Sequence, residues 1–253
     1  QVQKGLKTQE RQEVVFANYN ETKIRHFWEH LYHWLEIGPT QVTVTPSTTT
    51  IAGGAIPALP AGVAYTFPTT YNAGDIIQLE AAGGGATGLS GTYITGTKTL
   101  AVFSTHWCAN IPQQVCCCDH LEEQLFGLQR WGKKHVASRH SVRSSGTPDA
   151  VNWHIIAAEA NTTVSFSAAA GVTGLPVGNQ TLNAGQVLGL SVSGTVANPG
   201  DFIINADKPI LVMQYMSSSQ NTNASVENAG DPFMTQAVPV EQFLGEYVVL
   251  IPA

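Results

Sequence analysis

The stretch NAGDIIQL at residues 72–79 returns as NAGQVLGL at residues 183–190, shifted by 111 positions along the chain. Further on, YITGTKTLAV at residues 93–102 returns as IINADKPILV at residues 203–212, with the two aligned lysines 110 positions apart. Chance does not preserve the order and spacing of such blocks over about 80 residues. We therefore interpret the chain as an internal duplication of about 110 residues.

The repeated blocks have the pattern of β-strands. Apolar residues alternate with polar ones or form short β-branched runs between clusters of glycine, proline and asparagine, and helical periodicity is nearly absent. In Asn-Ala-Gly the glycine can take a positive φ, which suits a tight turn before the next strand. The clearest predicted strands lie at residues 41–45, 75–79, 99–103, 163–166, 186–190, 209–213 and 247–251.

These strands predict the fold class and the domain organisation. Strands of this length, spaced roughly 8–12 residues apart and separated by turn residues, are typical of β-sandwiches. We expect an all-β protein built of two tandem β-sandwich-like units. The first unit covers residues 1–125, of which residues 1–36 are only partly placed. The second unit covers residues 126–253 and runs into the start of a further unit near residues 240–253.

The stretch RHFWEHLYHWLEI (residues 25–37) fits two secondary structures. As a helix it would align three histidines along one face, namely His26, His30 and His33. As a strand, residues 31–37 would take the position that residues 153–158 take in the second unit, just before a threonine-rich strand. The duplication favours the strand, in which the three histidines do not converge on a metal.

Composition narrows the range of partners. Charged residues make up 12% of the 253 residues, and the formal net charge is −6. Nucleic-acid binding depends on clustered Lys and Arg, and the one basic cluster, Arg130 to Arg143, is interpreted as a solvated face. No apolar window of about 18 residues is present, which predicts no membrane span. The chain begins at Gln1 rather than Met, so we expect a piece of a longer, processed protein.

Four cysteines lie close together in the first unit, and three interpretations compete for them. A zinc site would use Cys and His ligands, but adjacent cysteines lack the spacing of usual zinc ligands. A cysteine nucleophile at Cys118 would have His120 as its base, yet nothing supplies an orienting group or an oxyanion hole. The candidate zinc ligands are His106, Cys116, Cys118 and His120, together with Cys108.

The third interpretation is a disulfide staple, which requires least of the sequence. Cys108 would close a loop of about ten residues with Cys118 or with Cys116, and would stabilise the fold by roughly 2–3 kcal/mol. Adjacent cysteines rarely pair with each other because of their geometry. A disulfide implies an oxidising compartment. We therefore predict no metal and no cofactor.

Several stretches carry a resemblance to a known family. AVFSTHWCANIP at residues 101–112, followed by CDHLEEQL at residues 118–125, resembles the signature of the IgGFc-binding protein N-terminal domain family. Three later stretches are similar to another block of the same family: ADKPILV at residues 206–212, GDP at residues 230–232 and VEQF at residues 240–243. The likeness covers most of the chain after residue 40, whereas the stretch before it departs from the family pattern.

The resemblance implies a function and a disulfide. The family consists of secreted, modular, cysteine-containing proteins. In animals it includes a mucus-associated protein described as binding the Fc part of immunoglobulin G, and in bacteria large surface or secreted proteins. It implies no catalytic residues. It also implies that Cys108 and Cys118 form the disulfide pair, which leaves Cys116 and Cys117 as additional cysteines.

Together these observations predict a non-catalytic extracellular binding or adhesion module of a larger secreted or surface protein, not an enzyme. Its partner would be a protein or glycan ligand, or copies of itself in a homo-oligomer. Asn-x-Ser/Thr sequons, which suit a secreted protein, occur at Asn20, Asn161, Asn179 and Asn223. One alternative is a self-assembling structural subunit of an extracellular filament or surface layer. The other, from a different class, is a secreted metal-dependent or cysteine hydrolase.

Overall fold

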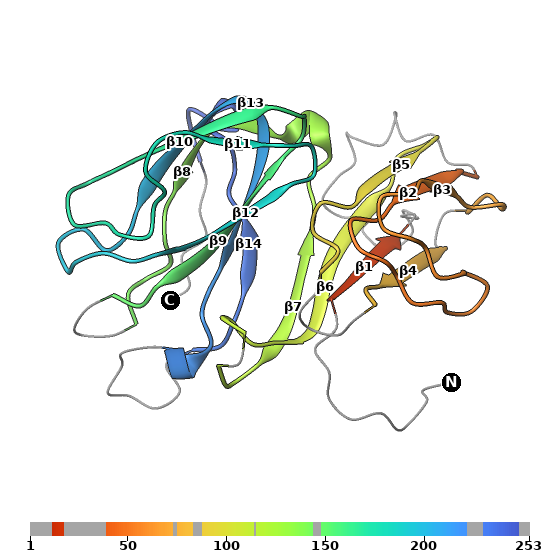
Figure 1. Ribbon diagram of the computed structural model, residues 1–253, viewed down its shortest axis with the longest axis horizontal. Helices are drawn as coiled ribbons and strands as arrows, with labels where there is room; N and C mark the ends of the chain where they lie inside the picture. The colour runs from red at the N-terminus through yellow and green to blue at the C-terminus, as the bar shows by residue number, and fades with distance from the viewer. Residues whose placement is uncertain are drawn as a thin grey trace. The chain divides into compact units, whose positions relative to one another are not determined.

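A computed structural model describes most of the chain, and strands dominate its secondary structure (Figure 1). The described residues are 12–17, 39–72, 75–82, 88–113, 115–143, 148–221 and 230–247. Three short 3-10 helices are the only helical elements within these ranges. The prediction of an all-β protein is therefore confirmed. The segment 25–37 and the sequons at Asn20 and Asn223 lie outside the described residues, while Asn161 and Asn179 are exposed.

The strands have the following bounds: β1 Gln12–Ala17, β2 Val42–Thr45, β3 Tyr65–Thr66, β4 Ile76–Glu80, β5 Tyr93–Gly96, β6 Ala101–Ala109, β7 Asp119–Gln124, β8 Gly132–Ala137, β9 Val151–Ala157, β10 Thr162–Ala168, β11 Gln180–Leu182, β12 Val187–Val192, β13 Phe202–Tyr215 and β14 Met234–Gln236. The 3-10 helices are η4 Leu128–Arg130, η5 Ser219–Asn221 and η6 Val240–Gln242. Six of the seven predicted strands coincide with observed ones. The exception is the last, because Tyr247 is not in a strand and residues 248–251 lie outside the described part of the chain.

The chain forms two compact units, and each is described by itself. The first unit contains the chain up to Leu125, and among the described residues it also takes 215–221 and 230–234. The second unit begins at Phe126 and contains most of the remaining chain.

The first unit has two sheets. A four-stranded sheet has the order β4-β1-β6-β7, and a three-stranded sheet has the order β3-β2-β5, with every printed pairing antiparallel. Both sheets contribute to one apolar core, because β2 and β4 each turn alternate residues inward. The buried members of this core are Val42, Val44, Leu59, Phe67, Ile77, Leu79, Ala81 and Leu89.

β1 occupies the centre of the four-stranded sheet, where it pairs with both β4 and β6. Its sequence, QEVVFA, is short and apolar in its centre, and it was not among the predicted strands. The strand predicted at residues 31–37 lies outside the described residues.

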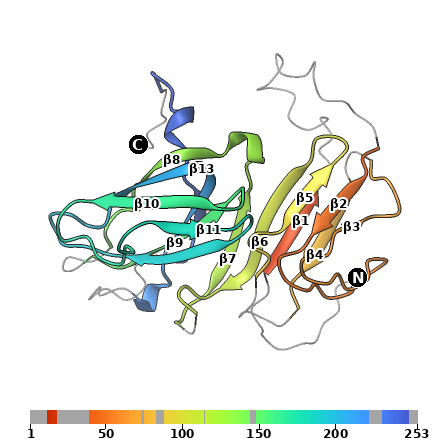
Figure 2. The ribbon, with the colours of Figure 1, turned by 45° about the horizontal axis from the view of Figure 1, so that its top comes forward.

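The second unit is organised around β13, the longest strand. A seven-stranded sheet follows the path β11-β10-β13-β9-β12, and β8 and β14 also pair with β13. The first half of β13 lies between β10 and β8, with Ile204 opposite both Phe166 and His135 (Figure 2). A register shift between Asn205 and Ile210 interrupts the ladder with β8. β13 is long enough to pair with four strands, and its neighbours therefore change along its length.

The core of the second unit is larger than that of the first. Trp153 lies at its centre and packs edge-on against Phe202, with ring centroids 5.4 Å apart. Burying an aromatic ring of this size removes a large apolar area from water, which is the main favourable term in folding. The other buried members are Ala137, Val151, Ile155, Ala157, Val164, Leu182, Leu190, Val192, Ile204, Ile210 and Val212.

Candidate functional site

The cysteines lie where β6 and β7 are joined. The two strands pair in antiparallel register up to His106 and Leu121, and an irregularity then brings Ala109 opposite Asp119. A disulfide joins Cys108 to Cys118, whose Cα atoms are 5.0 Å apart. It closes the connection between the two strands at its base, over a sequence separation of 10. The loop between them, residues 109–117, is therefore held at both ends.

A second disulfide joins the neighbours Cys116 and Cys117. The expectation that adjacent cysteines do not pair with each other is thus wrong for this chain. Cys116, the alternative partner considered for Cys108, is bonded elsewhere. Since all four cysteines are in disulfides, none is free.

Hydrogen bonds fix the closed loop to a second segment of the first unit. The amide of Ile111 donates to Oγ of Ser218 at 2.9 Å, and the amide of Ser218 donates back to the carbonyl of Ile111 at 2.6 Å. The amide of Gln220 donates to the carbonyl of Cys116 at 3.3 Å. Ser218 is fully buried, so these bonds satisfy groups that burial would otherwise leave unpaired.

The two histidines proposed as zinc ligands do not converge. His106 lies opposite Leu121 in the ladder, so its side chain shares the face of Leu121, and His120 points to the other face. Nε2 of His120 lies 3.4 Å from the carboxylate of Glu122, in an exposed position. A cysteine held in a disulfide provides no thiolate, either as a metal ligand or as a nucleophile. Within the described residues no group of three His, Cys, Asp or Glu side chains is arranged to hold a metal ion.

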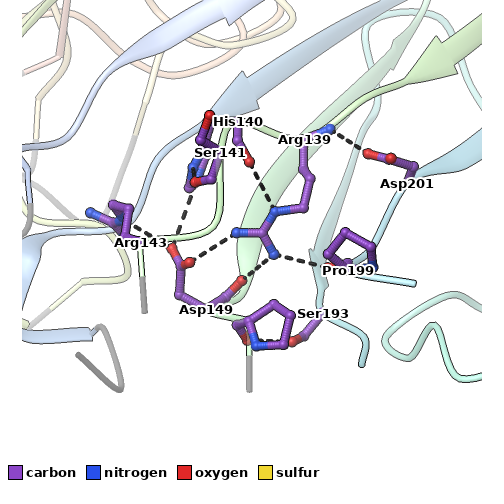
Figure 3. A network of polar contacts seen from close by, with 9 residues as sticks. Arg139, His140, Ser141, Arg143, Asp149, Ser193, Pro199 and Asp201 are labelled. Atoms are coloured by element: carbon purple, nitrogen blue, oxygen red, sulfur yellow. Dashed lines mark hydrogen bonds and ion pairs between the residues drawn. The ribbon is translucent and has the colours of Figure 1, made fainter. Parts of the chain in front are cut away.

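A polar cluster in the second unit was not anticipated (Figure 3). Asp149 is a fully buried carboxylate that receives hydrogen bonds from Arg139 at 2.8 Å and from Arg143 at 2.7 Å. The arginine side chains are 3% and 10% exposed. The interpretation of the basic cluster as a solvated face is therefore wrong for these two residues. The sequence did contain one signal of this cluster, because Asp149 is the first acidic residue after the two arginines and lies close to them in the chain.

Arg139 connects three segments of the second unit. Its guanidinium also donates to the carbonyls of His140, Asp149 and Pro199, at 2.8 to 3.0 Å, and its backbone amide donates to Asp201 at 2.8 Å. Because a guanidinium presents its donors in a fixed plane, it can hold several acceptors at once. Both carboxylate oxygens of Asp149 are engaged by arginine, so this cluster is a structural tie rather than an acid–base site.

Burial and charge act in opposite directions on Asp149. Burial by itself raises the pKa of the carboxyl, but the hydrogen bond and charge of Arg143, with the charges of His140 and Arg139, lower the pKa below its usual value. For His140, burial dominates and lowers the pKa of the imidazole. At neutral pH the cluster therefore contains an ionised Asp149 between two cations and a neutral His140.

The edge of β8 that does not pair with β13 is covered by the segment that follows β14. The amides of Lys133 and Lys134 donate to one carboxylate oxygen of Glu241, at 2.8 and 3.2 Å, and His135 forms a bridge with Pro239. Burial raises the pKa of Glu241, but the amide hydrogen bonds outweigh it and lower the pKa overall. The VEQF stretch thus has a structural role, because it caps an edge that would otherwise expose its amides.

These features define the class: an all-β protein whose cysteines are all paired and whose described polar clusters serve the structure. The family model of the IgGFc binding protein matches residues 37–253, and the chain belongs to this family. The resemblance seen in the sequence is thereby confirmed, and the match begins three residues before position 40, where the likeness was expected to begin. Neither the curated proteins nor the solved structures contain a match. In the described part of the chain, no helix has the length and apolar character required to cross a membrane.

Proposed function

We propose that the chain is a non-catalytic, extracellular module that binds a protein ligand. The family match over residues 37–253 carries this proposal, because the family is one of binding proteins. Two disulfides suit an oxidising, extracellular compartment. Since no cysteine is free and both carboxylate oxygens of Asp149 are held by arginine, the geometry favours binding over the hydrolase alternative.

The closed loop between β6 and β7 is the surface that we assign to the ligand. Pro112, Gln113, Cys116 and Cys117 are exposed there, while the base of the loop is held by the Cys108–Cys118 disulfide. A loop that is already rigid loses little conformational entropy on binding, and more of its contact energy therefore appears as affinity. The family description makes the Fc part of immunoglobulin G the first ligand to test.

The test is surface plasmon resonance with the protein immobilised and Fc as analyte, against Fab and a panel of mucin-type glycans. We expect saturable binding of Fc, and a loss of at least about tenfold in affinity, roughly 1.4 kcal/mol, for Gln113→Arg. The matched control is Val177→Arg in the second unit, at a position 99% exposed, which should bind as the wild type does. Binding that ignores Gln113→Arg would remove the loop from the proposal, and binding of glycans but not of Fc would replace the ligand class.

We further propose that the two units are tandem β-sandwich-like repeats with their boundary at residue 125. The sheet order supports this. In the first unit the larger sheet runs β4-β1-β6-β7, and in the second unit the path β12-β9-β13-β14 has the same connectivity. The smaller sheet β3-β2-β5 likewise corresponds to β11-β10 and the first half of β13. The repeated sequence blocks fall on corresponding strands in both comparisons.

The strand registers support the same relation. Val42 pairs with Gly96 between β2 and β5, and Val164 pairs with Ala206 between β10 and β13. The repeat offset of 110 positions relates Gly96 to Ala206, and the sequence alignment of the threonine-rich strands relates Val42 to Val164. A slip of one residue in either ladder would move every side chain of the strand to the opposite face of the sheet. Agreement of the two registers therefore supports the duplication strongly.

Two hydrogen bonds recur as well. The amide of Asn72 donates to the side chain of Asp75 at 2.7 Å, and the amide of Asn183 donates to the side chain of Gln186 at 2.9 Å. These residues stand at the same positions in the NAG turn of each repeat. The second bond joins a backbone amide at the start of the threonine-rich strand to the side chain of the residue just before the aligned lysine. The amide of Gln41 donates to Thr97 at 3.0 Å, and the amide of Thr163 donates to Asp207 at 2.8 Å.

An experimental structure tests the duplication directly. Superposition of β4 on β12 and of β2 on β10 should bring β1 onto β9 without further adjustment. A different strand order in either unit would contradict the proposal. The self-assembling subunit is the second candidate function, and one observation favours it: among the described strands of the first unit, β5 has a partner on one side only.

A further inference from the structure

β5 has a free edge within the described residues, and the corresponding strand of the second unit does not. β5 pairs with β2 on one side only. Its counterpart, the first half of β13, is flanked by β10 on that side and by β8 on the other (Figure 2). The first unit therefore lacks, among its described strands, the one that β8 supplies to the second.

The backbone groups on this edge can be assigned by alternation. The amide of Thr97 donates to the carbonyl of Gln41 beyond the end of β2, so the amides of Tyr93 and Thr95 face β2 as well. Ile94 and Gly96 then direct their amides and carbonyls outward. Of these two residues Gly96 is exposed and Ile94 is half-buried, and among the described strands only β2 pairs with β5, which leaves the outer edge open to a further strand.

The second unit shows what such a strand looks like. In the ladder with β13, Ala137 lies opposite Phe202 and His135 lies opposite Ile204. Both of these β8 side chains are buried, at 0% and 1% exposure, while their neighbour Val136 is exposed. A strand at this position thus directs alternate side chains, here one alanine and one histidine, into the interior of the unit.

The origin of β8 in the chain suggests its equivalent. β8 comes shortly after EQLFG at residues 123–127, and the near-identical EQFLG recurs at residues 241–245. The stretch that follows the second copy is YVVLIPA at residues 247–253, an uncharged run with several β-branched residues. This stretch follows EQFLG as β8 follows EQLFG, and β8 completes the sheet of the unit that comes after its motif.

From the duplication proposed above, we infer that residues 247–253 of a second copy of this chain add as an antiparallel strand to the outer edge of β5. The six residues after Tyr247 reach about 20 Å when extended, whereas the four residues of β5 span about 13 Å. Residues 93–97 carry no charge, which suits an uncharged partner. The edge strand β7 is a poorer acceptor, because its acidic side chains oppose strand addition.

This contact is heterologous, since the donor segment and the acceptor edge lie at different places on the chain. A heterologous contact that does not close into a ring generates an open, head-to-tail assembly. The inference thus identifies the contact that the filament or surface-layer alternative requires. Main-chain hydrogen bonds provide the affinity in this kind of recognition, and the pockets for alternate side chains provide the specificity.

The test uses the whole protein and the synthetic peptide GEYVVLIPA, residues 245–253. The matched control peptide contains Val249→Pro, which removes a donor and fixes φ in the middle of the strand. Amide hydrogen exchange is measured with each peptide in excess. We expect the wild-type peptide to slow exchange at Ile94 and Gly96 by about tenfold or more, and the control peptide to have no effect.

The same substitution in the full chain gives a second readout. Wild-type protein should associate in sedimentation velocity as its concentration rises, while the Val249→Pro protein should sediment as a monomer across the same series. Protection at β4 or β7 in place of β5, no protection at all, or equal association of the two proteins would each overturn the inference. Binding of Fc by the Val249→Pro protein separates this result from the proposed function, because a loop-bound ligand does not require the donor segment.

Discussion

Acid should destabilise the second unit through one buried imidazole. His135 on β8 is 1% exposed, and its Nδ1 atom has no hydrogen-bond partner among the described residues. Burial disfavours the charged imidazolium and lowers the pKa of His135 from 6.5 to about 4, although the nearby charge of Glu241 acts in the opposite direction. Between these two pH values the unfolded chain binds a proton at this residue and the folded chain does not.

The magnitude follows from the linkage between protonation and folding. Stability from a neutral, buried His135 is fully present above pH 6.5 and is lost as the pH falls through about 4. Each unit of pKa difference corresponds to about 1.4 kcal/mol, so the loss at this residue approaches about 3 kcal/mol at pH 4. His140 and His154, whose pKa values are also lowered by burial, add to the total acid sensitivity.

The assay is urea denaturation of wild-type, His135→Leu and Val177→Leu proteins between pH 7 and pH 4. His135→Leu should show a pH dependence smaller by about 3 kcal/mol, because leucine fills the site without titrating. Val177→Leu exchanges one apolar side chain for another at a position that is 99% exposed, and it should retain the wild-type dependence. If His135→Leu lost as much stability on acidification as the wild type, the argument from burial would be refuted.

Three further predictions address other contacts. Asp149→Asn leaves two buried guanidinium groups without their anion and should cost about 3–5 kcal/mol in urea denaturation, with equal stability of variant and wild type as the contrary outcome. Cys108→Ser with Cys118→Ser should lower stability by about 2–3 kcal/mol, and non-reducing peptide mapping should find this pair linked in the native protein. Gly174 has φ +89 and faces the carbonyl of Ser191, so Gly174→Ala should lower the melting temperature, and an unchanged melting temperature would contradict this reasoning.

Much of the secondary structure was predictable because its signal is local. In β4, Ile77 and Leu79 are buried while Ile76 and Gln78 are exposed, and this period of two is visible in the sequence alone. The NAG turn before each repeated strand is equally local, since its hydrogen bond spans three residues. The family signature could be recognised for the same reason, as it consists of short contiguous stretches.

Features that depend on distant segments were not predictable. The strand between β4 and β6 comes from Gln12–Ala17, and any short apolar segment of the N-terminal region satisfies the same local pattern. The burial of Arg139 was missed because a guanidinium enters the interior only where several acceptors converge, and those acceptors come from residues 140, 149 and 199. The pairing of Cys116 with Cys117 was missed for another reason, because adjacent cysteines rarely pair and the sequence carries no mark of the exception.

The sequence by itself determined that this chain is built of strands and belongs to a family of binding proteins. The alternation of apolar and polar residues and the turn residues indicate strands because both act over a few positions along the chain, whatever the tertiary structure is. Only the tertiary structure decided which strand fills the central place of a sheet and which charges are buried. Those outcomes depend on contacts between residues tens of positions apart, where closing one loop determines which partners remain for the others.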